Sequence, residues 1–296
     1  MEAIQNVIKG TFIVKVAGFC SFLGEELVPI AVMAVFYWCI DKDFGKYIAT
    51  SVATGCVANP MVKNLFMRRR PYFDNPGIEC LRPVEKGYDI YDIVHQGWSF
   101  PSGHSTNSVA CFTALAVYKK KNPYIILGIL LPLFIGCSRF CLGVHYPTDV
   151  MVGWLLGGIV MMAVYLMTVM VKDKRNMYLV LLIMGLPGLI YCRTADYFTA
   201  YGLMVGLFAG FLFEDSFVHF ETTHNVLRGI IRVVLGIAIF EGFNTLVKLP
   251  LDPLFLASSS VGSLVFRIIR YAVDSFLIAA VYPLLFKVGD KIFKKK

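Results

Sequence analysis

Three short polar segments stand out in a sequence that is otherwise rich in apolar residues. They are KNLFMRRRP (Lys63–Pro71), PSGH (Pro101–His104) and SRFCLGVHYPTD (Ser138–Asp149). Lysine and arginine side chains pair with phosphate oxygens, and arginine can donate two parallel hydrogen bonds. The three segments therefore predict a site for a phosphate group. Its cations would be Lys63, Arg70 and Arg139.

The step from Ser102 to His104 comes just before an apolar stretch and predicts the start of a helix. A serine at this position caps a helix, and the free amides and positive dipole of the first turn bind anions. Gly103 would let the backbone approach the anion closely, because glycine has no side chain. His104 would then lie at the rim of the anion site.

His145 and Asp149 are four residues apart at the start of another predicted helix, with Pro147 between them as a first-turn residue. At that spacing the carboxylate can accept the proton of one imidazole nitrogen, which leaves a lone pair on the other nitrogen. Two histidines near one phosphate predict divided roles. One would attack phosphorus, and the other would protonate the leaving oxygen.

The composition indicates an integral membrane protein as the scaffold of this site. Of the 296 residues, 57% are hydrophobic and 16% are charged, and the mean hydropathy is +0.66. We expect an all-α, polytopic helical bundle of about nine transmembrane helices, give or take one. The apolar runs that predict these helices are Glu26–Ile40, Tyr47–Val62, Val109–Tyr118, Tyr124–Cys137, Val150–Val171, Met177–Cys192, Tyr197–Phe213, Val226–Leu246 and Val261–Val288.

Positive charge is concentrated in every second connection between these runs, which the positive-inside rule places in the cytoplasm. The remaining connections would face outside, and all three polar segments fall among them. The net charge of +8 is spread over short clusters, so it does not indicate nucleic acid as a partner. The cytoplasmic clusters are Lys42/Lys46, Lys119–Lys121, Lys172/Lys174/Arg175, Arg228/Arg232 and the C-terminal Lys291–Lys296; the outer connections are 64–103, 138–149, 193–197 and 247–262.

Lys9 and Lys15 interrupt the N-terminal apolar residues, which is not typical of a secretory signal. Residues 4–24 instead predict one amphipathic helix that is interfacial or half-inserted in the membrane. Asn59-Pro60 predicts a kink inside a membrane span. Eight cysteines are scattered without a CxxC pair, so neither a disulfide framework nor a zinc site is indicated. No metal or other cofactor is expected.

Two further groups of polar residues in the outer connection have simpler interpretations. Arg68 and Arg69 would reach lipid headgroups, or a second phosphate. Trp98 is typical of an aromatic belt at the membrane surface, and His95 could border a lipid headgroup together with Tyr88 and Tyr91.

Two acidic stretches are assigned no chemistry. Glu25 and Glu26 would mark the start of a helix at the outer interface. The stretch Phe213–His224 (FEDSFVHFETTH) shows no ligand pattern, and we expect a solvated or interfacial cytoplasmic loop.

The three polar segments together resemble the signature of the type 2 phosphatidic acid phosphatase superfamily, K-x6-R-P, then P-S-G-H, then S-R-x5-H-x3-D. Every specified position is matched, in order, by Lys63, Arg70, Pro71, Pro101, Ser102, Gly103, His104, Ser138, Arg139, His145 and Asp149. The resemblance implies that His145 is the nucleophile of a phosphohistidine intermediate, that Asp149 holds its ring and that His104 is the general acid. It also implies that no metal is needed. The phosphoryl group would be held by Lys63, Arg70, Ser102, Gly103 and Arg139.

The resemblance extends from about Gly24 to Val171. Within it, Leu23–Ile48 is similar to the opening helices of the sphingosine-phosphate phosphatase branch. The family's minimal core has about six helices. We therefore expect a phosphatase core with an N-terminal interfacial helix in residues 1–172, and extra transmembrane helices of unknown role in residues 173–296.

These features predict a lipid phosphate phosphatase of a bacterial cell membrane, with its site at the outer leaflet and its C-terminus in the cytoplasm. Its partners would be the bilayer and a lipid phosphate. Candidate substrates are a polyprenyl diphosphate, a phosphatidate or phosphatidylglycerol phosphate, and a sphingoid-base phosphate. Two alternatives remain open: a lipid phosphotransferase on the same scaffold, and a non-enzymatic protein that binds or transports a polyprenyl phosphate.

Overall fold

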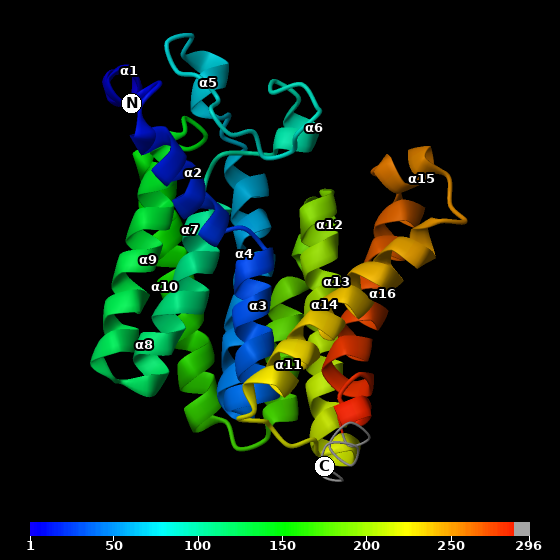
Figure 1. Cartoon of the computed structure of the whole chain (residues 1–296). Coiled ribbons are helices and arrows are strands. Elements are labelled where there is room, and N and C mark those ends of the chain that lie inside the picture. Colours follow the sequence, from blue (N-terminus) through cyan, green and yellow to red (C-terminus); the bar gives the residue numbers. More distant parts are fainter. Residues whose placement is uncertain (287–296) are drawn as a thin grey trace. The chain divides into compact units, whose positions relative to one another are not determined.

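The computed structural model describes residues 1–286, and all regular secondary structure within them is helical (Figure 1). These residues form two compact units. Unit 1 contains residues 1–30 and 58–163, and unit 2 contains residues 31–57 and the chain from residue 164 onward. This division differs from the predicted boundary at 172/173, because residues 31–57 cluster with the C-terminal helices. The predicted cytoplasmic tail Lys291–Lys296 lies outside the described residues.

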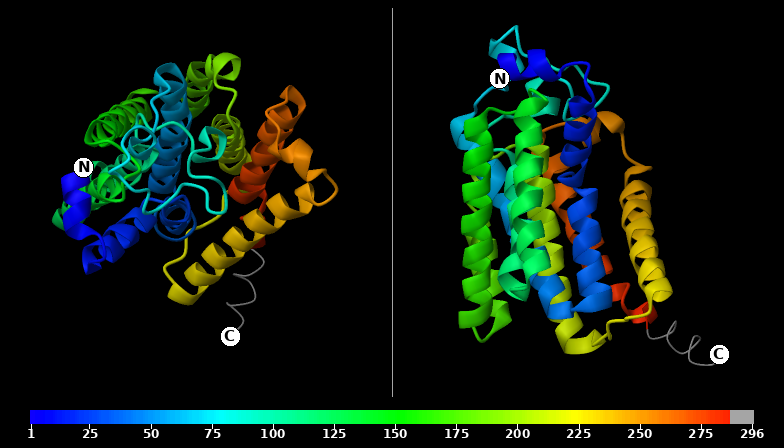
Figure 2. Two further views of the ribbon diagram at one scale, coloured as in Figure 1. Left: turned by 90° about the horizontal axis from the view of Figure 1, so that it is seen from above. Right: turned by 60° about the vertical axis from the view of Figure 1, so that its left-hand side comes forward.

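Unit 1 is built around long helices that run side by side (Figure 2). The connection between α4 and α7 carries two short helices and lies at the same end of the unit as the N-terminus (Figure 1). The helices are α1 (Glu2–Ile8), α2 (Phe12–Leu23), the end of α4 (Lys42–Phe66), α5 (Pro71–Asp74), α6 (Ile93–Gln96), α7 (Gly103–Ser108), η2 (Val109–Thr113), α8 (Ala114–Lys119), α9 (Asn122–Cys141) and α10 (Pro147–Met170) as far as residue 163.

The N-terminal segment is two helices, so the prediction of one helix over residues 4–24 was wrong. The helices α1 and α2 meet at an angle of 113°. Gly10 has a φ of +76°, which glycine adopts without strain, and Thr11 caps α2 by accepting a hydrogen bond from the amide of Ile13. These two neighbouring residues end one helix and start the next. The amphipathic pattern continues across the break and gave no signal of it.

Unit 2 contains most of α3 (Leu27–Val35) and the first part of α4. The apolar run Met177–Cys192 is divided near Pro187 into two helices. The remaining elements of the unit are η1 (Phe36–Ile40), the end of α10, α11 (Lys174–Gly185), α12 (Gly188–Tyr191), α13 (Ala195–Phe213), η3 (Glu214–Val218), α14 (Val226–Lys248), α15 (Pro253–Ala257), α16 (Val261–Phe276) and η4 (Leu277–Val281).

The closest helix pair in unit 2 is α13 with α16. A row of small residues, Gly202, Gly206 and Gly210, lets the two backbones touch. A Cβ atom at Gly206 would lie 2.0 Å from the carbonyl oxygen of Ala272. Ser275 adds a hydrogen bond of 3.1 Å to the carbonyl of Leu203. Small residues at such spacing are typical of helix pairs inside membranes, where close packing drives association.

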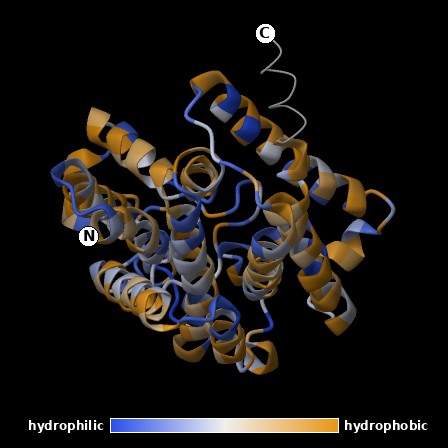
Figure 3. Ribbon diagram, turned by 90° about the horizontal axis from the view of Figure 1, so that it is seen from below, coloured by the Kyte–Doolittle hydropathy of each residue, from blue (hydrophilic) through white to orange (hydrophobic). Residues whose placement is uncertain are grey.

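Four described helices are long and apolar enough to cross a membrane, and a fifth span results if α1 and α2 count as one. The four are α9, α10, α14 and the helix from Ala195 to Val218. The predicted count of about nine is therefore not confirmed, because the other apolar helices are shorter, broken or carry more charge. Exposed apolar residues follow one face of α10 at helical spacing, and Figure 3 shows apolar residues along most helices. Such faces suit lipid rather than water. The exposed residues of α10 include Met151, Leu155, Ile159, Met162 and Leu166.

Candidate active site

The PSGH segment forms the start of helix α7. Ser102 is the N-cap, as predicted, and its hydroxyl accepts hydrogen bonds from the amide and the hydroxyl of Ser105. Asn59, on α4, donates hydrogen bonds to the carbonyl of Pro101 at 3.3 Å and to the hydroxyl of Thr106 at 3.0 Å. Asn59 is buried. It therefore fixes this helix start from the side, a role that the sequence did not reveal.

Helix α10 brings the third polar segment to the second. The amide of Ser102 donates a 2.9 Å hydrogen bond to the carbonyl of Asp149, in the first turn of α10. This approach needs a glycine at position 153. A Cβ atom there would lie 2.7 Å from the carbonyl oxygen of Ser102 and 2.8 Å from the Cβ of Ser105. Gly157 meets the carbonyl of Thr106 in the same way.

Helix α9 supplies Arg139 in its last turn, and the connection that follows supplies His145. Arg139 is buried and its Nη1 donates a hydrogen bond to the hydroxyl of Ser21 on α2. Its Nε has no hydrogen-bond partner among the described residues. Gly143 has a φ of +78°, and a Cβ atom there would lie 2.2 Å from the carbonyl oxygen of Glu79. This turn directs the chain so that His145 is buried beside Arg70.

Arg70 joins two of the polar segments. Its guanidinium donates to the carbonyls of Gln96 at 2.6 Å and Gly97 at 3.1 Å, and to that of Val144 at 2.9 Å. Its Nη1 also lies 3.4 Å from Nε2 of His145. A phosphate bound beside Nε2 of His145 would therefore meet the guanidinium of Arg70.

The other ring nitrogen of His145 faces Asp149. Nδ1 lies 3.5 Å from Oδ2 of the carboxylate. The hydroxyl of Ser99 lies between them: it donates a 2.5 Å hydrogen bond to Oδ2 and is 3.4 Å from Nδ1. The amide of Tyr146 donates to the same Oδ2 at 2.8 Å. This arrangement favours the proton on Nδ1 and leaves the lone pair on Nε2, toward Arg70.

Asp149 has a second partner that contradicts one sequence interpretation. Arg68 donates to Oδ1 of Asp149 at 2.9 Å and to the hydroxyl of Thr148 at 2.8 Å, and it lies 3.8 Å above the ring of Tyr146. The expectation that Arg68 reaches lipid headgroups was therefore wrong. Arg69 points elsewhere and lies 3.7 Å from Asp74.

His104 lies in the first turn of α7, and its ring lies close to the backbone of Gly24. A Cβ atom at Gly24 would lie 3.1 Å from Cδ2 of His104 and 2.6 Å from Ile135. Nε2 of His104 is buried and has no hydrogen-bond partner among the described residues. The ring is within electrostatic range of Arg139, His145 and Lys63. All eight sequence-predicted site residues belong to unit 1. The charges of Lys63, Arg70 and Arg139 act on both His104 and His145.

The environment of His145 keeps its ring neutral. His145 lies between α9 and α10, and its burial, followed by the charges of Arg70, Arg139 and Lys63, lowers its pKa well below the ordinary value of 6.5. A neutral imidazole is the form that can attack phosphorus.

This lowered pKa has a consequence for stability. Below pH 6.5 the unfolded chain binds a proton at His145 that the folded chain does not, so stability falls as the pH falls. For one such proton the limiting slope is roughly 1.4 kcal/mol per pH unit. We expect the unfolding temperature in detergent to fall less steeply between pH 6.5 and 5 for His145→Asn than for the wild type. Equal slopes would contradict a neutral, buried His145.

Comparison with known proteins identifies the family. Residues 44–173 match the PAP2 superfamily, and residues 198–290 match the PAP2 superfamily phosphatase transmembrane extension. The chain belongs to the PAP2 superfamily. All eight predicted site residues lie in the first match, and most of α13 with all of α14 and α16 lies in the second.

Curated relatives of this PAP2 protein are lipid phosphatases by name. It is 34% identical over 116 residues to lipid A 1-phosphatase of Rhizobium etli, covering 38% of this chain and 46% of that protein. It is 40% identical over 91 residues to phosphatidylglycerophosphatase B of Bacillus subtilis, covering 27% and 42%. It is 31% identical over 141 residues to undecaprenyl-diphosphatase of Sulfolobus acidocaldarius, covering 47% and 63%.

The chain therefore spans between two fifths and two thirds of the length of these relatives. The predicted similarity to the sphingosine-phosphate phosphatase branch is not confirmed. No solved structure matches the chain.

Other polar residues of unit 1 form contacts within or against the connection between α4 and α7. His95 bonds to Asp92 through Nδ1 at 2.6 Å and stacks on Tyr88 with ring centroids 3.6 Å apart. Glu25 pairs with Arg82, which also donates to the carbonyl of Gly18 at 2.7 Å. These contacts give each group a structural partner.

The stretch Phe213–His224 was predicted to be a solvated or interfacial loop, and this was wrong for its first half. Residues 214–218 continue α13 as η3, and Glu214 is fully buried. Its carboxylate accepts hydrogen bonds from Lys42 at 2.7 Å and Lys46 at 2.8 Å, and Asp215 pairs with Lys46 at 2.5 Å. The two lysines neutralise the buried carboxylate, so its burial does not require a ligand.

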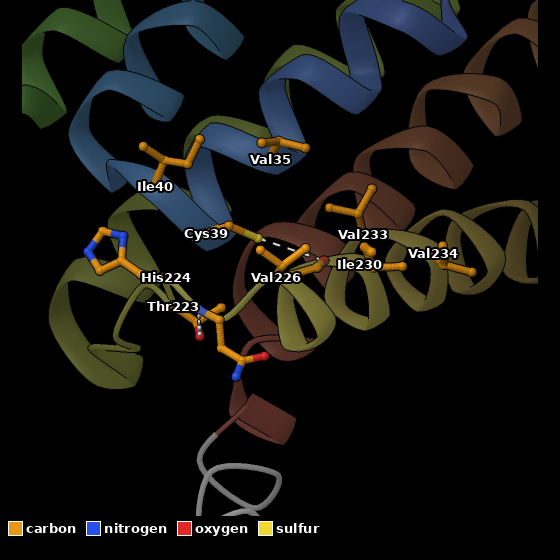
Figure 4. A pocket seen from close by; sticks show the side chains of 11 residues that line it. Val35, Cys39, Ile40, Thr223, His224, Val226, Ile230, Val233 and Val234 are labelled. Atoms are coloured by element: carbon orange, nitrogen blue, oxygen red, sulfur yellow. Dashed lines mark hydrogen bonds between the residues drawn. The ribbon is translucent and has the colours of Figure 1, made fainter.

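A groove in unit 2 is separate from the predicted site. It encloses about 430 Å³ between the end of α3 with η1 and the start of α14. Val35, Cys39 and Ile40 face Val226 and Ile230 across it, and His224 lies at its edge (Figure 4). None of the eight predicted site residues lines it. The groove is therefore distinct from the predicted phosphate site.

Proposed function

We propose that the protein is a membrane phosphatase that hydrolyses the phosphate ester or diphosphate of a lipid through a phosphohistidine at His145. The observation that carries this proposal is the environment of the two His145 nitrogens. Nδ1 faces Asp149 and Ser99, and Nε2 faces Arg70 in a buried, cationic setting. A protein that only binds phosphate would need the cations but not an oriented, neutral imidazole.

The first step would transfer the phosphoryl group to the protein. Nε2 of His145 forms a bond to phosphorus while the bond from phosphorus to the lipid oxygen breaks. His104 must be protonated for this step. Burial and the charges of Arg139 and Lys63 disfavour that form, and the negative phosphate of the bound lipid would offset these charges. The protonated His104 then donates its proton to the lipid oxygen, so the lipid alcohol leaves neutral. Arg70, Arg139 and Lys63, with the amides at the start of α7, would stabilise the charge on the phosphoryl oxygens.

The second step would hydrolyse the phosphohistidine and regenerate free His145. His104, now neutral, accepts a proton from water as the water oxygen bonds to phosphorus. The bond between phosphorus and Nε2 breaks, and inorganic phosphate leaves. From the charge distribution of the connections we infer that this site would face the outside of a cell membrane. Lipid tails would remain in the bilayer beside the exposed apolar faces of the helices.

The proposal is tested by phosphate release from lipids in mixed micelles by the purified protein. The panel contains a polyprenyl diphosphate, a phosphatidate, a phosphatidylglycerol phosphate, a lipid A 1-phosphate and a sphingoid-base phosphate. At least one should yield inorganic phosphate. Product analysis by mass spectrometry with added lipid alcohols separates hydrolysis from transfer to an acceptor. Phosphate binding without release from any lipid would overturn the proposal.

Gly103 offers a test of the anion site that is separate from folding. A Cβ atom there would meet only Oδ1 of Asn59, at 3.5 Å, so the protein itself leaves room for alanine. We expect Gly103→Ala to fold normally but to raise KM about tenfold or more, because the methyl group would occupy space beside the bound phosphate. The readouts are thermal unfolding and steady-state kinetics.

Gly153→Ala is the matched control for this glycine. Its Cβ would collide with the Ser102 carbonyl, so we expect a lower unfolding temperature. Unchanged kinetics in Gly103→Ala would remove this residue from the phosphate site.

A further inference from the structure

The transmembrane extension contains a buried ionisable group that has no hydrogen-bond partner among the described residues. Asp274, on α16, is fully buried, and neither of its carboxylate oxygens has a hydrogen-bond partner among the described residues. Arg270, one turn away on the same helix, is within electrostatic range of Asp274 but forms no hydrogen bond with it. Burial of an unpaired carboxylate is costly, and ionisable groups inside membrane helices usually mark a functional site.

Two other buried side chains of the same unit also have a polar atom without a hydrogen-bond partner among the described residues. Arg270 is 5% exposed, and its Nε has no hydrogen-bond partner within residues 1–286, although its guanidinium lies 4.6 Å from the ring of Tyr271. Asn244, on α14, is 7% exposed, and its Oδ1 has no hydrogen-bond partner in the same part of the chain. Helices α14 and α16 are in contact, and Glu241 of α14 is within electrostatic range of Asp274. The incomplete groups therefore gather where these two helices meet.

The side-chain atoms without a hydrogen-bond partner indicate which chemical groups a ligand would need. Two carboxylate oxygens and one amide oxygen accept hydrogen bonds, and Nε of Arg270 donates one. A primary ammonium carries three N–H donors and a positive charge, which match the three acceptors. A phosphate oxygen would match Arg270, and the nearby cations Lys248 and Arg267 favour an anion on that side. A ligand that satisfies all of these atoms would carry a primary amine close to a phosphodiester.

We propose that the α14–α16 junction binds the headgroup of an aminophospholipid, with its ammonium at Asp274 and its phosphodiester at Arg270. Phosphatidylethanolamine has this chemistry. Phosphatidylcholine does not, because its quaternary ammonium has no N–H group. An inorganic cation would satisfy Asp274 but leave Arg270 incomplete.

The packing of α14 gives a lipid a route to this site. Only 17% of the most apolar window of α14 is buried, compared with 50% for the span that starts at Ala195. In contrast, α16 is held firmly against α13 by the row of glycines. A lipid can therefore approach between α14 and α16 from the side. The proposal does not depend on the phosphatase site, which lies in the other unit.

The test is binding of short-chain phosphatidylethanolamine to the full-length protein in detergent, measured by calorimetry and by thermal shift. The wild type should bind it saturably, and phosphatidylcholine with the same chains should bind at least about tenfold more weakly. Asp274→Asn should lose about tenfold or more in affinity for phosphatidylethanolamine and none for phosphatidylcholine. Arg270→Gln provides a second variant that should also weaken binding.

Two controls separate this site from other effects. Asp196→Asn makes the same substitution at an exposed position in the same unit, and should bind as the wild type does. His145→Asn should also keep the affinity, because its site is the phosphate site. Equal binding of the two lipids by the wild type would overturn the proposal. So would full affinity in Asp274→Asn, which would make Asp274 simply a protonated acid in the membrane.

Discussion

His145→Ala should reduce phosphate release by at least about 10³-fold while the protein still folds in detergent. The expected loss is large because the substitution removes the only atom proposed to bond to phosphorus. We expect the variant to fold. Arg70 would lose its 3.4 Å contact with the His145 ring but keep its shorter hydrogen bonds to three backbone carbonyls. Activity on a responsive lipid and the unfolding temperature are the two measurements.

A trapping experiment makes this prediction specific to the covalent step. With a radiolabelled lipid phosphate and rapid quenching in alkali, the wild type should carry label on a histidine, and His145→Ala should carry none. His224→Ala is a suitable control, because this exposed histidine lies in unit 2. Activity above a few per cent of wild type in His145→Ala would rule out His145 as the nucleophile.

His104→Ala should behave differently in the same experiment. It would keep the nucleophile but lose the proton donor, so label should still accumulate from a diphosphate, whose leaving group needs less protonation. The orphaned Nε2 of His104 is the structural reason to expect this role.

Two local features of the predicted phosphate site could be read from the sequence, because each depends on a single helix start. The cap at Ser102 and the spacing of His145 to Asp149 are properties of single helix starts, and both occur as predicted. Fold class followed in the same way from apolar runs of helical length. These features depend on neighbours within a few residues.

The partners that orient the site were not predictable, because they come from distant segments. Ser99 reaches Asp149 across 50 residues, and Asn59 reaches Thr106 across 47. A serine before a Phe-Pro step, or an asparagine before a helical proline, gives no sign of such contacts. The buried Glu214 is a similar case. The acidic residues around Glu214 in the sequence suggest a solvated loop. The structure shows Lys42 and Lys46, about 170 positions earlier in the chain, bonded to its carboxylate.

Asp149→Asn should lower kcat by about 10² to 10⁴-fold while KM changes only severalfold. The carboxylate accepts hydrogen bonds from Ser99 and Tyr146 on Oδ2 and from Arg68 on Oδ1. An asparagine must turn its NH2 group toward one of these donor sets. If the NH2 group faces His145, it favours the tautomer with the lone pair on Nδ1, and Nε2 then cannot attack phosphorus.

Ser99→Ala separates tautomer control from a purely structural role of Asp149. It keeps the carboxylate and its bonds to Tyr146 and Arg68, and removes only the hydroxyl between Asp149 and His145. We expect kcat to fall about tenfold, much less than in Asp149→Asn, with a normal unfolding temperature. Single-turnover measurements should show that the slow step in both variants is formation of the phosphohistidine. If Asp149→Asn instead weakens substrate binding while turnover survives, Asp149 holds the first turn of α10 against α7 and does not orient the nucleophile.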